Sequence, residues 1–136
     1  MDKEIAKMWA DALRSKEYKQ GYFDLATPNG KFCALGVLVD LLITNGIVPS
    51  YRWSIDNSDF IGPIYLEHNR TGVDYSAVIP STIRHQIGMD LAFERAITRK
   101  NDRDRMSFER IANYIDEHHG RPVSKFRKLF DFIFNH

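Results

Sequence analysis

The sequence predicts an α+β fold, in which a mostly helical single domain surrounds a buried central helix and carries a small antiparallel β-sheet. Three observations predict it. Between Gly30 and Leu42 the only charges are Lys31 and Asp40, and such an apolar run is typical of a helix buried on nearly all sides. Apolar residues recur at helical spacing near the N-terminus and throughout the C-terminal half. Two strand-like runs within residues 60–79 flank a turn.

The composition limits the classes of function. Hydrophobic residues make up 43% of the 136 residues and aromatic residues 12%, which excludes a disordered chain and fits one domain over residues 1–136. The formal net charge of +1 gives no global reason to expect nucleic acid as a partner. The single cysteine excludes an internal disulfide framework and a multi-cysteine zinc site. We expect no metal and no cofactor.

The N-terminus begins with charged residues and lacks the basic and apolar regions of a signal peptide. No apolar run reaches the roughly 20 residues that are needed to span a bilayer. We therefore expect a cytoplasmic protein with no membrane partner.

The first expected elements are a helix and a hairpin. Residues 2–17 form an amphipathic helix with Asp2 as N-cap. Five apolar residues share one face of this helix: Ile5, Met8, Trp9, Ala12 and Leu13. Residues 22–32 resemble a short antiparallel hairpin, because Pro28-Asn29-Gly30 is a turn sequence between two apolar arms.

The central helix is expected over residues 33–44, ending at Asn45-Gly46, which favour the left-handed conformation that terminates helices. The segment that follows holds Tyr51 and Trp53 and is expected to be a loop. Residues 60–66 and 73–79 are expected to be strands. Pro63 argues that the first of these strands lies at a sheet edge.

The spacing predicts four further helices from residue 80 onward. Each begins at a residue that favours a helix start: Pro80, Asp90, Ser107 and Ser124. Residues 101–105 are expected to be a polar loop. The last helix, 124–136, is apolar almost all round, and Phe132 and Phe134 lie off its buried stripe. It therefore either packs deeply or forms the interface of a homodimer.

Cys33 lies at the first turn of the central helix, and two interpretations fit it. Free cysteine is among the residues most often buried in cores. Alternatively, a helix N-terminus lowers the pKa of a thiol and makes it a better nucleophile. A cysteine enzyme also needs a histidine as base, and the candidates are His68 and His85.

A second candidate site joins two polar groups at helix ends. We predict that Tyr18, Lys19, Gln20, Asn101 and Asp102 converge and bind a ligand, with Lys19 contacting an anion. In the alternative interpretation they cap helices and tie loops together, as Asn and Asp routinely do.

Basic residues also cluster at Arg99, Lys100, Arg103 and Arg105. Such a patch fits phosphate or an acidic protein, although Asp102 and Asp104 dilute it and a solvated face is the simpler interpretation.

Six segments share a family pattern: Trp9-Ala10-Asp11-Ala12-Leu13-Arg14-Ser15, Tyr18-Lys19-Gln20-Gly21, Phe32-Cys33-Ala34-Leu35-Gly36-Val37-Leu38-Val39-Asp40-Leu41, residues 80–89, Asn101-Asp102 and Ser107-Phe108-Glu109-Arg110-Ile111-Ala112. Together they resemble a family of small proteins common in tailed bacteriophages and prophages. The segment that begins at Phe32 matches a Phe-Cys-x-Leu-Gly-Val-Leu-x-Asp-Leu motif. The resemblance covers about two-thirds of the chain and leaves residues 47–79 outside it.

The resemblance implies a non-enzymatic phage-type accessory protein in the host cell cytoplasm. We expect it to bind a host protein or to sequester a small anionic ligand, with counter-defence as one role. The alternative is a cysteine-dependent hydrolase or transferase that uses Cys33. The two differ in a simple respect, because an enzyme needs Cys33 exposed in a cleft beside a histidine. We do not expect nucleic acid as a partner, because that third interpretation requires the basic clusters to share one face.

Overall fold

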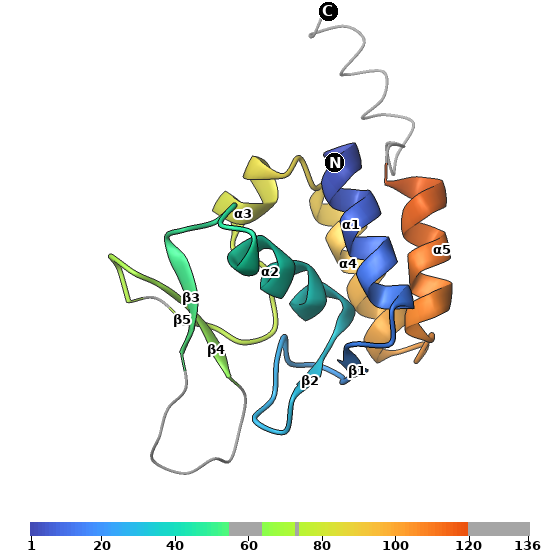
Figure 1. Ribbon diagram of the computed structural model, residues 1–136, viewed down its shortest axis with the longest axis horizontal. Helices are drawn as coiled ribbons and strands as arrows, with labels where there is room; N and C mark the ends of the chain where they lie inside the picture. The colour runs from blue at the N-terminus through green and yellow to red at the C-terminus, as the bar shows by residue number, and fades with distance from the viewer. Residues whose placement is uncertain (55–63, 73, 120–136) are drawn as a thin grey trace, which may run out of the picture.

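The central helix α2 (Ala34–Thr44) separates a helical half of the protein from a β half (Figure 1). The computed structural model describes residues 1–54, 64–72 and 74–119. Helices α1 (Lys3–Arg14), α4 (Leu91–Asp102) and α5 (Phe108–His118) lie together on one side of α2. A sheet of three strands lies on the other side, and the short helix α3 (Ser81–Gln86) lies near the C-terminal end of α2.

The helix starts are fixed by side chains that accept hydrogen bonds from the first free backbone N–H groups. Asp2 accepts from the backbone of Ile5, and Asp90 accepts from Ala92. Ser107 accepts from Arg110 in the same way. All three starts agree with the sequence prediction.

Helix α2 is buried as predicted, with seven of its residues in the core: Ala34, Leu35, Gly36, Val37, Leu38, Val39 and Leu42. Gly36 is required by a backbone contact. A Cβ atom added there would lie 1.7 Å from the carbonyl oxygen of Leu25, so no side chain fits. The segment before the turn therefore packs directly on the backbone of α2.

The β-structure forms two separate sheets rather than one. Strands β1 (Lys19–Gln20) and β2 (Lys31–Phe32) pair in parallel. Strand β4 (Tyr65–His68) pairs antiparallel with both β3 (Tyr51–Ser54) and β5 (Asp74–Tyr75). The antiparallel sheet was predicted, and the parallel pair was not.

The predicted hairpin over residues 22–32 forms only in part: Ala26 pairs antiparallel with Phe32 across the predicted turn, but residues 22–25 are not a strand. Gly30 has the left-handed conformation expected of it, with φ 79°. The first arm does not form a strand, because Phe23 also has a positive φ and Leu25 donates its N–H to the carbonyl of Ser76. Residues 19–20 take its place beside β2.

Several further boundaries differ from the prediction. Helix α1 ends at Arg14 rather than at residue 17, and only Asp74–Tyr75 of the strand expected over residues 73–79 forms β5. Tyr51–Ser54 is a strand and not a loop, since it pairs residue by residue with Tyr65–His68. Asn101 and Asp102 belong to the last turn of α4. Residues 60–63, 73 and the predicted helix 124–136, with Phe132 and Phe134, lie outside the described residues, so the homodimer stays a prediction.

In the part of the chain that the structure describes, no helix combines the length and the apolar character needed to cross a membrane.

Candidate functional site

Asn101 is the centre of a hydrogen-bond network that joins three segments of the chain. Its side chain is 1% exposed. Its Oδ1 accepts from Gln20 Nε2 at 3.0 Å and from the backbone N–H of Ala34 at 3.2 Å. Its Nδ2 donates to the carbonyl of Gly21 at 3.0 Å and to Asp102 Oδ1 at 2.8 Å. We call these contacts the Asn101 network.

The network leaves no capacity for a ligand at its centre. An asparagine side chain has two donors and an acceptor oxygen with two lone pairs, and all four positions of Asn101 are occupied by protein groups. Gln20 also donates to the carbonyl of Met106, and Asp102 accepts from the backbone of Phe23. Gln20, Asn101 and Asp102 therefore converge as predicted, and their hydrogen bonds connect separate segments of the chain.

Tyr18 and Lys19 do not take part in this network. The Tyr18 hydroxyl donates to Asp40 Oδ2 at 2.6 Å, and Trp53 Nε1 donates to Asp40 Oδ1 at 3.0 Å. Burial, together with the hydrogen bond to Asp40, raises the pKa of Tyr18. Lys19 is exposed. Tyr18 and Lys19 thus lie outside the Asn101 network, and the Tyr18 hydroxyl binds the aspartate of α2 instead. Ligand binding by the five residues stays a prediction.

Cys33 is a structural residue in this fold. It is 5% exposed, and its Sγ accepts a hydrogen bond from the backbone N–H of Gly36 at 3.4 Å. Burial raises the pKa of the thiol to about 12, against the opposing effect of that hydrogen bond. A thiol with this pKa is almost fully protonated at neutral pH and is a poor nucleophile.

The structure does not bring either histidine to Cys33. His68 packs its ring against Tyr51 and accepts the backbone N–H groups of Arg70 and Thr71. His85 is exposed on α3. The described contacts therefore do not assemble a cysteine–histidine pair.

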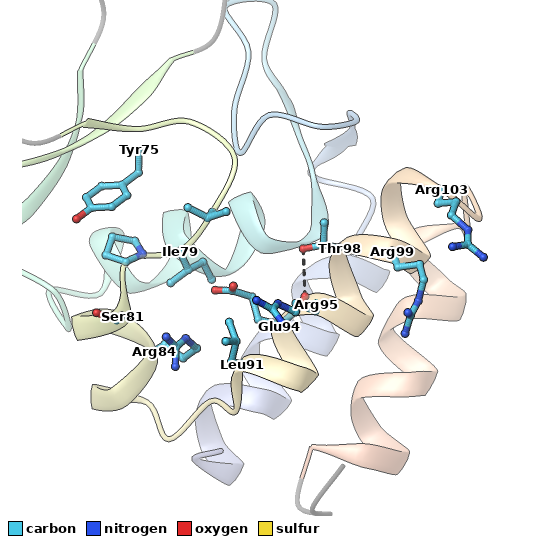
Figure 2. A pocket seen from close by; sticks show the side chains of 12 residues that line it. Tyr75, Ile79, Ser81, Arg84, Leu91, Glu94, Arg95, Thr98, Arg99 and Arg103 are labelled. Carbon is cyan, nitrogen blue, oxygen red and sulfur yellow. Dashed lines mark hydrogen bonds between the residues drawn. The ribbon is translucent and has the colours of Figure 1, made fainter. Parts of the chain in front are cut away.

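A pocket of about 630 Å³ opens between α3, α4 and the segment that follows β5 (Figure 2). Its apolar wall is formed by five residues: Tyr75, Val78, Ile79, Pro80 and Leu91. Its polar lining includes Glu94, Thr98 and four arginines. Pockets of this volume are typical of small-molecule sites.

The four arginines come from two helices and the residue that ends one of them. Arg95 and Arg99 belong to α4, Arg103 is the C-cap residue directly after α4, and Arg84 comes from α3 (Figure 2). Because Arg95, Arg99 and Arg103 are four residues apart, they share one side of α4. Among the described residues, the ion pair at 3.9 Å between Arg103 and Asp104 is the one carboxylate contact of this set. The Nε atom of Arg84 is buried without a hydrogen-bond partner.

Glu94 is the acidic member of this lining and is 5% exposed. Its Oε1 is buried and has no hydrogen-bond partner among the described residues. Burial raises the pKa of Glu94, while Arg84, the backbone N–H of Ile79 and Arg95 act in the opposite direction. The pocket thus combines a positive lining with one buried, unsatisfied acceptor.

Comparison with known families places the whole described structure in one of them. The family described as domain of unknown function DUF8296 matches residues 1–119. The chain belongs to this family. No curated protein and no solved structure matches the DUF8296 chain significantly. The Asn101 network and the arginine-lined pocket both lie within the matched residues.

The sequence pointed to only part of this pocket. Arg99 and Arg103 belong to the basic cluster noted in the sequence, whereas Arg84, Glu94 and Arg95 of the DUF8296 chain were not singled out. Lys100 and Arg105 of that cluster turn elsewhere and lie over the rings of Tyr114 and Tyr22. A usable indication was present, since Glu94 occupies the apolar stripe of its helix, three residues before Ile97.

Proposed function

We propose that this DUF8296 protein is a non-enzymatic binding protein that sequesters a small anionic ligand in the arginine-lined pocket. The observation that carries the proposal is the gathering of Arg84, Arg95, Arg99 and Arg103 around one cavity. Guanidinium groups present planar, permanently charged sets of N–H donors, and they bind phosphate and carboxylate groups with two parallel hydrogen bonds.

The small-ligand alternative is favoured over a host protein because the charged groups line a concave pocket with an apolar wall. The wider setting that we propose is the one implied by the resemblance to phage proteins. A phage-type accessory protein in the host cytoplasm would remove such a ligand from the host, which fits a counter-defence role. Binding alone is sufficient for this role, and the buried thiol of Cys33 supports the non-enzymatic alternative.

Calorimetric titration of the full chain with inorganic triphosphate, at fixed ionic strength and without divalent cations, tests the proposal. We expect saturable binding at one site per chain. The double variant R95A/R99A should weaken it at least tenfold, because a hydrogen bond to a charged group contributes roughly 1.5–3 kcal/mol.

A matched control separates a site from general charge attraction. The variant K7A/R110A removes the same charge from exposed positions on α1 and α5, outside the pocket lining. It should bind triphosphate like the wild type. Equal losses in the two double variants would contradict the proposed function.

A further inference from the structure

The lining of the pocket restricts the chemical class of the ligand beyond the requirement for negative charge. Glu94 faces the same cavity as the arginines, and its Oε1 is a buried acceptor without a partner. An ionised carboxylate can only accept hydrogen bonds. A ligand that fills the pocket must therefore bring an N–H or O–H donor to Glu94 as well as an anionic group to the arginines.

Two of the arginines, Arg84 and Arg95, lie beside Glu94, whereas Arg99 and Arg103 lie away from it. Figure 2 shows the carboxylate of Glu94 directed toward Ile79. Arg99 and Arg103 lie on the right-hand side of the view, toward the C-terminal end of α4. Tyr75 lies at the opposite end from Arg103. The donor end of the ligand thus belongs near Glu94 and the apolar wall, and its anionic end belongs near Arg99 and Arg103.

The apolar wall adds a third requirement. Tyr75, Ile79 and Leu91 offer surface against which a flat, weakly polar group can be buried. Inorganic phosphates have no N–H donor for Glu94 and no apolar part. Sugar phosphates carry donors and charge, but they lack a planar face.

We propose that the ligand is a nucleotide, with a base N–H donated to Glu94 and its phosphates bound by the arginines. This proposal rests on the proposed function of the same pocket. Amino and imino N–H groups on the edges of nucleic-acid bases are recognised by carboxylates in this way. A cavity of about 630 Å³ is also of the size that encloses one such molecule.

The test compares ligands that share the anionic part and differ in the base. Wild-type protein is titrated with each of the four common ribonucleoside triphosphates and with inorganic triphosphate, at fixed ionic strength and without divalent cations. We expect at least one nucleotide with an amino group on its base to bind ten times more tightly than inorganic triphosphate.

The variant E94L removes the acceptor and leaves the arginines in place. We expect it to keep its affinity for inorganic triphosphate and to lose the preference for the nucleotide. E4Q, on the exposed face of α1, also removes one negative charge and should keep that preference. Thermal unfolding checks that both variants fold, and E94A, which also removes the acceptor, serves if E94L does not fold.

The outcomes distinguish the two proposals. If inorganic triphosphate binds as well as every nucleotide, or if E94L keeps the nucleotide preference, the nucleotide inference is overturned and the proposed function stands. If no nucleotide and no triphosphate binds, both are overturned.

Discussion

Glu94 and Cys33 are both buried, but their burial has opposite effects on the stability of the fold. The Glu94 carboxylate has an oxygen without a partner among the described residues, so its burial opposes folding. The Cys33 thiol has a partner in the backbone of Gly36 and is buried at little cost. Residues that bind a ligand often lower the stability of the empty protein, because their polar groups are satisfied only when the ligand is bound.

Replacing Glu94 by Gln should stabilise the protein at neutral and alkaline pH. Because the folded-state pKa of Glu94 is raised above the unfolded value, the ionised form destabilises the fold above that pKa. The penalty disappears as the pH falls through the folded pKa to below the unfolded one. We expect E94Q to gain about 1 kcal/mol at pH 8 and nothing at pH 3.5, measured by urea unfolding. An equal effect at both pH values would contradict this.

The N-cap role of Cys33 predicts an order among its substitutions. C33S should cost less than about 1 kcal/mol, because serine is a preferred N-cap and its hydroxyl can accept from Gly36. C33A should cost more than C33S, since it removes the acceptor. Unfolding in urea measures both. Thiol reagents should label native Cys33 only as slowly as the protein opens, and rapid labelling at pH 7 would show that the thiol is accessible.

At the scale of elements, two close contacts fix how the segments pack. Gly36 lets the backbone of Leu25 lie directly on α2. The Asn101 network then ties the C-terminal end of α4 to residues 20–23 and to the start of α2. The Asn101 network joins segments about 80 residues apart in the sequence.

Gly36→Ala should destabilise the protein strongly. The added Cβ would lie 1.7 Å from the carbonyl oxygen of Leu25, and that backbone must move. We expect a loss of at least about 3 kcal/mol in urea unfolding, at the upper end of overpacking effects. Gly30→Ala is the control, since no atom lies within 4 Å of its added Cβ and only its positive φ opposes the change. A smaller loss for G36A than for G30A would refute the close contact.

Asn101→Asp should be destabilising near neutral pH and less so in acid. A buried carboxylate cannot donate to Gly21 and would face Asp102, so it becomes protonated with a raised pKa in the folded state. The penalty is full above that pKa and is relieved as the pH falls. We expect a loss of about 2–4 kcal/mol at pH 7, by urea unfolding. Asn113→Asp, exposed on α5, should be nearly neutral.

These elements also show which features a sequence can predict. The helices were predictable because their periodicity and caps, such as Asp2 and Ser107, are local. The pairing of β1 with β2 was not, since two-residue strands leave no periodic pattern, and the arm expected there instead donates from Leu25 to Ser76, about fifty residues away. The pocket could not be predicted, because it forms only where α3 and α4 meet. The spacing of Arg95, Arg99 and Arg103 does not show that Arg84 lines the same cavity.

At the scale of the whole molecule, the two candidate regions lie on different parts of the fold. The Asn101 network holds the loops around the start of α2, whereas the pocket lies where α3 and α4 meet. The net charge of +1 means that the attraction for anions is local to the pocket. Binding should therefore weaken with added salt, by screening over about 10 Å at 0.1 M.

Amide chemical shifts recorded during titration with inorganic triphosphate test the central claim most directly, because they locate the site without any substitution. The account predicts that the largest changes fall in two segments, residues 79–84 and 91–103, and that they saturate together. Changes centred on residues 18–20, changes scattered over basic residues of α1 and α5, or no changes at all would contradict it.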